Sequence, residues 1–171
     1  MDQDLRPYIH EALFVALSDL AGCGVFSRDD IPADTVLVRF GGRIFPSTSR
    51  FSVELLPSTA VGLTEETLLA EPASSYRDAS DYINHSCDSN LGLVDAVTVV
   101  SKRSIHRGEE LTCDYSYWEG DESYRMKQPC HCGSARCRVT ITGRDWALPA
   151  MRNEIIDWAS PYIRRRLTSG R

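Results

Sequence analysis

The stretch PCHCGSARCR, residues 129–138, carries three cysteines within eight positions: Cys130, Cys132 and Cys137. This spacing brings three thiolates around one point without the entropic cost of closing a long loop. A structural zinc ion takes four thiolate or imidazole ligands in tetrahedral geometry, so one more ligand is needed. The sequence predicts a zinc site here, with either His131 or a residue from elsewhere in the chain as the fourth ligand.

Cys87, in the sequence NHSC, is the favoured fourth ligand. It lies more than forty residues before Cys130, so its binding would make the metal a staple between distant segments. His131 stands between two ligands, where the chain has little room to bend back to the same ion. Cys23 and Cys113 are left over, and for both we expect the role of a small, buried, hydrophobic residue.

The composition is typical of a single globular domain that stays inside the cell. The chain has 171 residues, of which 42% are hydrophobic. No apolar run approaches the length of a membrane span, and the N-terminus lacks the features of a secretory signal. We therefore expect no membrane partner and a cytoplasmic location, or a nuclear one in a eukaryote. Because reducing compartments keep thiols free, the six cysteines favour metal binding or chemistry over disulfides.

The net charge of −5 bears on the partner. It disfavours a broad grip on nucleic acid phosphates, so we expect no direct nucleic acid partner, and it would attract a cationic segment or small molecule. The clustered acidic residues have two interpretations, a solvated surface or the steering of a basic substrate. These residues are Glu109, Glu110, Asp114, Glu119, Asp121 and Glu122.

Short strands are expected through much of the chain. Alternating or β-branched apolar residues favour them, and glycines and prolines separate them. The expected strands are 13–17, 24–27, 35–40, 96–105 and 110–115. The chain is therefore predicted to be mainly β.

Two segments depart from this pattern. Residues 43–80 are rich in Pro, Ser and Thr and are interpreted as a variable insert, with a short helix expected at EETLLA, residues 65–70. After the cysteines, residues 151–159 have apolar side chains at helical spacing, and Pro161 breaks or restarts the helix before a basic stretch. We expect this closing segment to pack as an amphipathic helix.

Four short motifs follow one another along the chain: GCGVF at 22–26, NHSCDSN at 84–90, GEELTCDY at 108–115 and CHCGSARCR at 130–138. Together they resemble the SET family of lysine methyltransferases, whose usual forms are a GxGVF loop, an NHSCxPN box, a GEELTxDY strand and a post-SET CxCxxxxC cluster. The resemblance spans roughly residues 10–142. Each motif alone is weak, and the ordered set is specific. The short insert and the helical tail look like the compact stand-alone SET proteins common in bacteria.

The resemblance implies a mainly β fold of small, curved sheets, in which the C-terminal segment passes under a loop and forms a pseudoknot that brings NHSC and DY together. It implies a SET domain over residues 1–128 with the insert at about 43–80, a post-SET zinc segment at 129–145 and a C-terminal helical tail at 146–171. It also implies that Cys87 binds zinc together with the three clustered cysteines.

The activity that the resemblance implies is N-methylation of a lysine side chain, in a basic or lysine-containing protein or peptide, by S-adenosylmethionine. Tyr115 matches the family's catalytic tyrosine, and we expect it to orient the amine. Methyl transfer needs an aligned nucleophile in a dry channel, so positioning should dominate the rate. The amine must be neutral, so desolvation and the adjacent sulfonium must lower its pKa from about 10.4. The residues implied in cofactor binding are Gly22, Cys23, Gly24, Asn84, His85 and Tyr115.

The walls of a lysine channel are expected near the same motifs. Tyr82 and Tyr117 flank them and are candidates, and Cys113 stands where the family usually has phenylalanine or tyrosine. Because a hydroxyl at that position limits how many methyl groups fit, the smaller Cys113 leaves room for di- or trimethylation. Trp146 and Ile141 either cover the adenine of the cofactor or pack in the core.

Three positions depart from the family pattern. Ser89 replaces a proline, Val139 replaces a glycine, and Asp81 stands where many members have an arginine near the bound nucleoside.

Two other functions remain open. One is a SET fold that methylates a small-molecule amine or a peptide of secondary metabolism, because no targeting module is visible. The other is a zinc-stabilised binding module without catalysis. Retention of Gly22, Gly24, Asn84, His85 and Tyr115 argues against the binding module.

Overall fold

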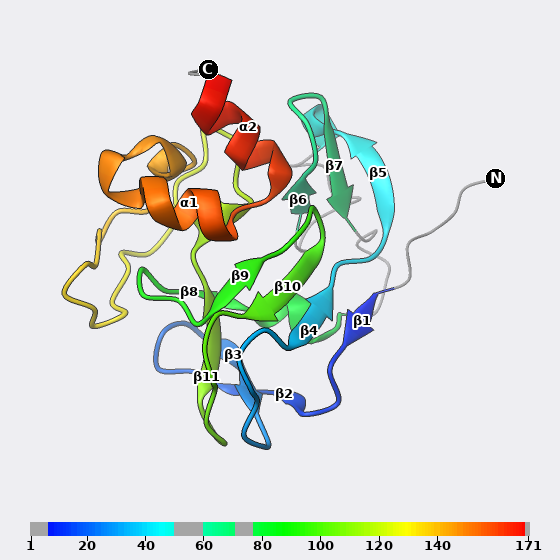
Figure 1. Ribbon diagram of the computed structural model, residues 1–171, viewed down its shortest axis with the longest axis vertical. Coiled ribbons are helices and arrows are strands. Elements are labelled where there is room, and N and C mark those ends of the chain that lie inside the picture. The colour runs from blue at the N-terminus through cyan, green and yellow to red at the C-terminus, as the bar shows by residue number, and fades with distance from the viewer. Residues whose placement is uncertain (1–6, 50–59, 71–76, 170–171) are drawn as a thin grey trace.

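The computed structural model of the protein describes residues 7–49, 60–70 and 77–169. Strands make up most of the regular structure in the first two thirds of the chain, and two helices at its C-terminal end pack against each other at one side of the strands (Figure 1). The mainly β fold with a helical C-terminal end that the sequence predicts is therefore confirmed.

The larger sheet has eight strands within the described residues. Their order is β1-β4-β10-β9-β11-β3-β2, with β8 paired to β11 beside this path. The bounds are β1 (Tyr8–Ile9), β2 (Leu13–Leu17), β3 (Cys23–Ser27), β4 (Val36–Arg39), β8 (Asn84–His85), β9 (Leu91–Leu93), β10 (Thr98–Ser101) and β11 (Glu110–Cys113). Each expected strand has a counterpart in this sheet.

Strand β11 is where distant segments meet. It pairs antiparallel with β3 and parallel with β8 and β9. The register puts Thr112 opposite Asn84 and Cys113 opposite His85. Because β11 ends at Cys113, Tyr115 leaves the sheet close to His85, on the short turn η3 (Tyr115–Tyr117). The expectation that NHSC and DY come together is confirmed.

The insert forms a second, smaller sheet in the order β5-β7-β6. Its elements are β5 (Arg43–Pro46), η1 (Ser47–Ser49), β6 (Ala60–Gly62), β7 (Thr67–Ala70) and, after the sheet, η2 (Ala79–Tyr82). The helix expected at 65–70 is wrong, because 67–70 form β7 and pair with a strand on each side. A short apolar run suits either element, and here the two partners decide for the strand. The parts of the insert at 50–59 and 71–76 lie outside the described residues.

The C-terminal segment consists of short helices: η4 (Asp145–Ala147), η5 (Pro149–Met151), α1 (Arg152–Trp158) and α2 (Pro161–Ser169). Pro161 begins α2, where its missing N–H costs nothing, so it restarts the helix as predicted. Ile155 of α1 and Ile163 of α2 are fully buried and join the core formed by the larger sheet. Among the described residues, none of the helices has the length and apolar character needed to cross a membrane.

Candidate cofactor and zinc sites

Asn84 ties the glycine turn before β3 to strand β11. Its side-chain amide donates to the carbonyl oxygens of Ala21 and Cys23 at 3.3 and 3.1 Å, and to Oε1 of Glu110 at 2.8 Å. The same carboxylate accepts a hydrogen bond from Ser18 at 2.8 Å. Three segments that are far apart in the sequence are therefore held together by one amide and one carboxylate.

Glycine is required at positions 22 and 24 of this turn for different structural reasons. Gly22 has a φ of +51°, a left-handed conformation that costs little for glycine. The φ of Gly24 lies outside the left-handed region, but a Cβ there would lie 2.1 Å from Oε1 of Glu110 and 3.0 Å from Nδ2 of Asn84. The close approach of β3 to these two side chains is possible only without a side chain at position 24.

Replacing Gly24 with alanine is therefore expected to move the side chains of Asn84 and Glu110. We expect the affinity for S-adenosylmethionine to fall about tenfold or more, measured by titration calorimetry. Gly108→Ala is the matched control: its φ is +81° but nothing lies within 4 Å of the added methyl, so stability should fall and affinity should stay within about twofold. Equal affinities for Gly24→Ala and the unaltered protein would contradict the role given to this contact.

Tyr115 is fixed at both ends. Its hydroxyl donates to the carbonyl oxygen of Ile83 at 3.1 Å, and its backbone N–H donates to Nδ1 of His85 at 3.2 Å. The ring packs between those of His85 and Trp118, with centroids 5.2 and 5.7 Å away. Burial raises the pKa of Tyr115 well above its ordinary value, so its side chain is a neutral, oriented phenol.

His85 connects Tyr115 to the cysteines. Burial lowers the pKa of His85 to about 4, although the Asp114 carboxylate opposes the shift, so the imidazole is neutral near pH 7. Because Nδ1 accepts from Tyr115, the ring proton is on Nε2, which lies 3.3 Å from Sγ of Cys87. The imidazole therefore donates toward a sulfur atom of the cysteine cluster.

A cavity of about 570 Å³ lies beside Tyr115. Its lining includes Asn84, His85 and Tyr115, the residues Leu20 and Ala21 of the glycine turn, and the segment 123–132 that leads into the cysteine stretch. Its size is that of a typical small-molecule site. Gly22, Cys23 and Gly24 shape the turn and are absent from the lining itself. The structure thus brings the two central motifs to one cavity.

The segment 123–132 is the part of this lining that sequence reasoning missed. It contributes Tyr124, Met126 and Lys127, among others. The proximity of Tyr124 adds to the rise in the pKa of Tyr115 that burial causes, which places the two phenols near each other. The sequence offered one signal, an aromatic residue shortly before the cysteines, but tyrosines are common in this chain and loops carry no periodic pattern.

The residues expected to wall a lysine channel lie outside the lining of this cavity. Tyr117 is 1% exposed, and its hydroxyl donates to Glu154 of α1 at 2.7 Å. Cys113 is fully buried in the core with Sγ 3.8 Å from the carbonyl oxygen of Leu91, and Tyr82 is half-buried on η2. Strand β11 directs Cys113 into the core, and the η3 turn directs Tyr117 toward α1.

Core packing also accounts for Trp146 and Ile141. Trp146 is 5% exposed in the main core, and its Nε1 donates to the carbonyl oxygen of Gly143. Ile141 is 1% exposed and packs with the cysteines. Of the two cysteines expected to be buried, Cys113 is buried as predicted, but Cys23 is exposed, because it lies at the first position of β3 beside the glycine turn.

Cys87, Cys130, Cys132 and Cys137 form a compact cluster. Their sulfur atoms all lie within 4.8 Å of one another, and those of Cys87 and Cys130 are 4.0 Å apart. Zinc–sulfur bonds of about 2.3 Å in a tetrahedron require sulfur separations of about 3.8 Å, so the cluster fits a zinc ion. Burial raises the pKa of Cys130 to about 11 and also that of Cys87, so a cation is needed to hold them as thiolates.

The gathering of Cys87 with the three clustered cysteines is confirmed, and zinc binding itself stays a prediction. His131 is not part of the cluster but lines the cavity beside Tyr115. The cluster and the cavity share Cys130 and Cys132, so the cysteine segment both closes the metal site and forms part of the cavity wall.

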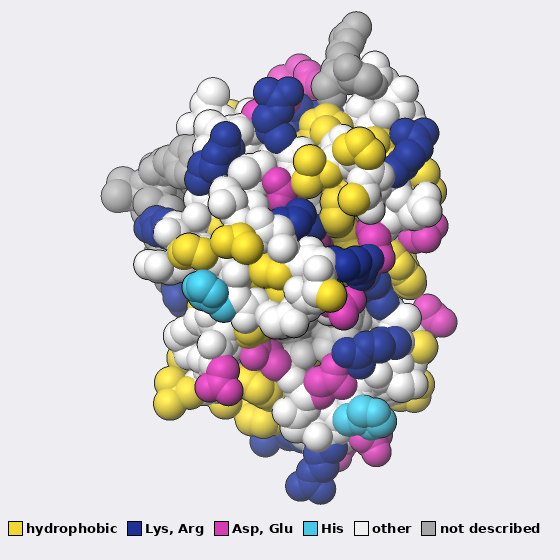
Figure 2. All heavy atoms as spheres, turned by 90° about the vertical axis from the view of Figure 1, so that its left-hand side faces the viewer, with side chains coloured by type: hydrophobic (Ala, Val, Ile, Leu, Met, Phe, Trp, Pro, Cys, Tyr) yellow, Lys and Arg dark blue, Asp and Glu magenta, His cyan; other side chains and the backbone are white. Residues whose placement is uncertain are grey.

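The clustered acidic residues are mostly engaged with other groups. Glu109 pairs with Arg103, Asp114 with Arg138, and Glu122 with Arg166. On the side of the molecule where the yellow to gold loop of Figure 1 projects, acidic and basic side chains alternate and form no patch of one sign (Figure 2). This arrangement favours neither a purely solvated acidic surface nor a broad electrostatic funnel.

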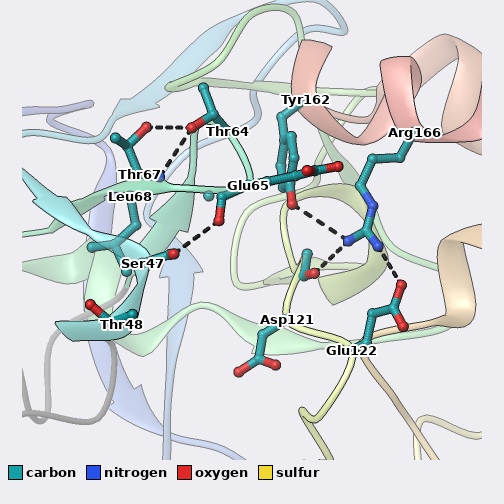
Figure 3. Close-up of a pocket in the computed structure, with 12 residues that line it drawn as sticks. Ser47, Thr48, Thr64, Glu65, Thr67, Leu68, Asp121, Glu122, Tyr162 and Arg166 are labelled. Carbon is teal, nitrogen blue, oxygen red and sulfur yellow. Dashed lines mark hydrogen bonds and ion pairs between the residues drawn. The ribbon is translucent and has the colours of Figure 1, made fainter. Parts of the chain in front are cut away.

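A separate hollow of about 370 Å³ lies between the insert sheet and α2. Figure 3 shows Tyr162 and Arg166 extending from α2 toward the hollow, with Arg166 turned toward Glu122. Ser47 donates to the carbonyl oxygen of Glu65 at 2.9 Å. None of the predicted site residues lines this hollow, so the candidate site is the cavity beside Tyr115.

The sequence around this site matches a known protein family. A family model described as the SET domain matches residues 22–116, more than half of the chain. The chain belongs to the SET-domain family. The matched range begins at the glycine turn, includes Asn84 and His85, and ends one residue after Tyr115. The cysteine stretch lies beyond it, so the division of the SET protein into segments at 129–145 and 146–171 stays a prediction.

Curated relatives of this SET domain are much longer proteins. The histone-lysine N-methyltransferase trr of Drosophila melanogaster is 30% identical over 139 residues, 74% of this chain and 6% of that protein. The human histone-lysine N-methyltransferase 2D is 27% identical over 153 residues, 78% of this chain and 3% of that protein. The H3 lysine-36 specific histone-lysine N-methyltransferase of Schizosaccharomyces pombe is 28% identical over 143 residues, 76% and 17% respectively. The chain spans a small part of the length of each.

Proposed function

We propose that this SET domain transfers a methyl group from S-adenosylmethionine to the neutral amine of a lysine side chain in a protein or peptide. The observation that carries the proposal is the cavity of about 570 Å³ lined by Asn84, His85 and Tyr115. Membership of the SET family, and relatives named as histone-lysine N-methyltransferases, support the same reaction.

The residues around the cavity suit this cofactor. Leu20 and Ala21 of the glycine turn line the cavity together with Asn84, and the amino acid part of the cofactor would be held there. When bound, the cofactor supplies a methyl group on a positively charged sulfur, which leaves as a neutral thioether. No strong acid or base is needed, and the neutral His85 and the raised pKa of Tyr115 agree with such a site.

Tyr115 is proposed to orient the attacking amine. Its hydroxyl is held by the carbonyl oxygen of Ile83 and keeps its lone pairs for an N–H of the amine. Burial of this corner excludes water, which lowers the pKa of a lysine amine and favours its neutral form. These residues contribute by orienting the amine and by excluding water, and these two effects account for large rate effects without proton transfer.

The cysteine cluster is proposed to hold one zinc ion as a structural staple. All four ligands come from the protein, which leaves no open vertex for catalysis. The ion would fix Cys87, two residues after His85, against the segment that forms part of the cavity wall.

The test is incubation of the protein with labelled S-adenosylmethionine and, in separate reactions, a proteome extract and a small-molecule extract. We expect label on protein lysines. Label confined to small molecules would favour the alternative of a metabolite or peptide amine methyltransferase. No label in either extract, with no binding of the cofactor, would favour a zinc-stabilised binding module.

We further propose that the reaction proceeds to di- or trimethyl-lysine. Cys113 lies two residues before Tyr115 on β11 and is small and fully buried. Its side chain faces the core and does not line the cavity, so its small size would act indirectly, by leaving Tyr115 room to shift for a methylated amine.

Cys113→Tyr is expected to shift the product toward monomethyl-lysine, because the larger side chain in the core would restrict the movement of Tyr115. Cys113→Phe is the matched control with the same bulk and no hydroxyl, and both variants should lose about 1–3 kcal/mol of stability through overpacking. Mass spectrometry of a time course measures the products. A wild-type reaction that stops at monomethyl-lysine, and is unchanged by Cys113→Tyr, would refute the proposal.

A further inference from the structure

Arg138 follows the last cysteine of the cluster, and its guanidinium is nearly buried. Nη1 and Nη2 donate to the two carboxylate oxygens of Asp114 at 2.7 and 2.8 Å, and Nε donates to Asp145 at 2.8 Å. The side chains of Asp114 and Asp145 are only 1% and 6% exposed. A bidentate ion pair of this kind fixes the orientation of the carboxylate as well as its distance from the guanidinium, whereas an ion pair through a single hydrogen bond fixes only the distance.

Asp114 forms the start of the turn that carries Tyr115. Its Oδ1 accepts hydrogen bonds from the N–H of Ser116 at 3.0 Å and from the Ser116 hydroxyl at 2.7 Å. Burial alone would raise the pKa of Asp114, but hydrogen bonds and the charge of Arg138 lower it, so the carboxylate is ionised. The path of the backbone into Tyr115 is therefore set by a carboxylate that Arg138 holds.

The backbone of Arg138 is tied to the cysteine cluster. Its N–H donates to Sγ of Cys87 at 3.3 Å, and its neighbour Cys137 is a member of the cluster. One residue thus contacts the cluster through its main chain and the turn of Tyr115 through its side chain. Tyr115 itself donates hydrogen bonds to Ile83 and His85, so the contact between Arg138 and Asp114 is a separate constraint on the turn.

We propose that Arg138 is a positioning residue: by holding Asp114 against the cysteine segment it fixes the orientation of Tyr115 at the cavity. The role in the reaction rests on the proposed function, whereas the structural constraint does not. Without the guanidinium, two buried carboxylates lose their partner and the turn is free to shift. A misplacement of about 1 Å at a reacting group costs about 100-fold in rate.

The first experiment compares Arg138→Gln with Arg136→Gln in the full chain. Arg136 is the matched control, because it flanks Cys137 on the other side and also makes ion pairs, with Asp88 and Glu154, but its side chain is 59% exposed. For Arg138→Gln we expect kcat to fall about 100-fold, with the KM for S-adenosylmethionine within about threefold and the zinc content unchanged. For Arg136→Gln we expect kcat within about twofold.

Two further variants separate positioning from a general loss of stability. Asp114→Asn and the double variant with Arg138→Gln should each lower kcat about as much as Arg138→Gln alone, because the two residues act as a unit. Arg138→Lys keeps the charge but loses the guanidinium that binds both carboxylate oxygens of Asp114, so kcat should fall about tenfold. If Arg138→Gln does not fold, Arg138→Lys takes its place in the test.

The second experiment needs no activity. Hydrogen–deuterium exchange of the peptide over residues 110–118 should be faster in the Arg138 variants and unchanged in Arg136→Gln. If the wild type transfers no methyl group but this difference is found, the proposed function fails and the positioning role stands. If the Arg138 variants keep the wild-type kcat, or their exchange over 110–118 matches that of Arg136→Gln, the positioning role is overturned.

Discussion

Replacing Tyr115 with phenylalanine is expected to lower kcat for methyl transfer by about 100- to 1,000-fold, the usual effect of removing one oriented hydrogen-bonding group from a buried reaction site. The lost hydroxyl is the one held by the carbonyl oxygen of Ile83 at 3.1 Å. The ring that packs between His85 and Trp118 is kept, so the KM for S-adenosylmethionine should stay within about threefold. Steady-state kinetics with a saturating protein substrate measures both parameters.

Tyr117→Phe is the control for this variant, because Tyr117 lies on the same turn and also loses a buried hydroxyl. That hydroxyl contacts Glu154 and Lys102, and none of these three residues lines the cavity. Its loss should lower the melting temperature and leave kcat within about threefold. If both variants lose activity to the same extent, the effect comes from the turn as a whole and the assignment of Tyr115 is wrong.

Removal of the metal is the second large effect. We expect about one zinc ion per chain, and Cys130→Ser should lose it, because a serine oxygen is a poor replacement for a thiolate on zinc. The melting temperature should fall by about 10 °C or more, since metal binding and folding are coupled in a closed structural site. Activity should fall to about 1% or less, because Cys130 belongs both to the cluster and to the cavity wall.

Metal analysis, a thermal melt and a methyl-transfer assay on the same sample check these three expectations. Cys23→Ser is the control for metal content: Cys23 is exposed and lies outside the cluster, so the variant should keep its zinc. A chain stripped of metal that retains full activity would show that the cysteines are not a staple for this site.

Much of the site was predictable from the sequence because its parts are short and chemically specific. The spacing of Cys130, Cys132 and Cys137 points to one metal ion, and the choice of Cys87 over His131 follows from how far a chain can bend. The strands were predictable because alternation of apolar residues is a local property, as in Leu13–Leu17.

The features that the sequence did not predict depend on how segments that are distant in the sequence come together. The run at 65–70 has residues suited to helix or strand, and only its pairing with β5 and β6 makes 67–70 a strand. Cys23 is exposed because of its place at the start of β3, which composition does not reveal. The wall at 123–132 and the buried pairing of Arg138 with Asp114 come from irregular loops, where no period marks which side chains turn inward.

Titration calorimetry of S-adenosylmethionine on the zinc-loaded chain measures whether the cavity beside Tyr115 binds this cofactor. We expect saturable binding of one cofactor molecule per chain. No binding heat at any accessible temperature, with the zinc content intact, would contradict it.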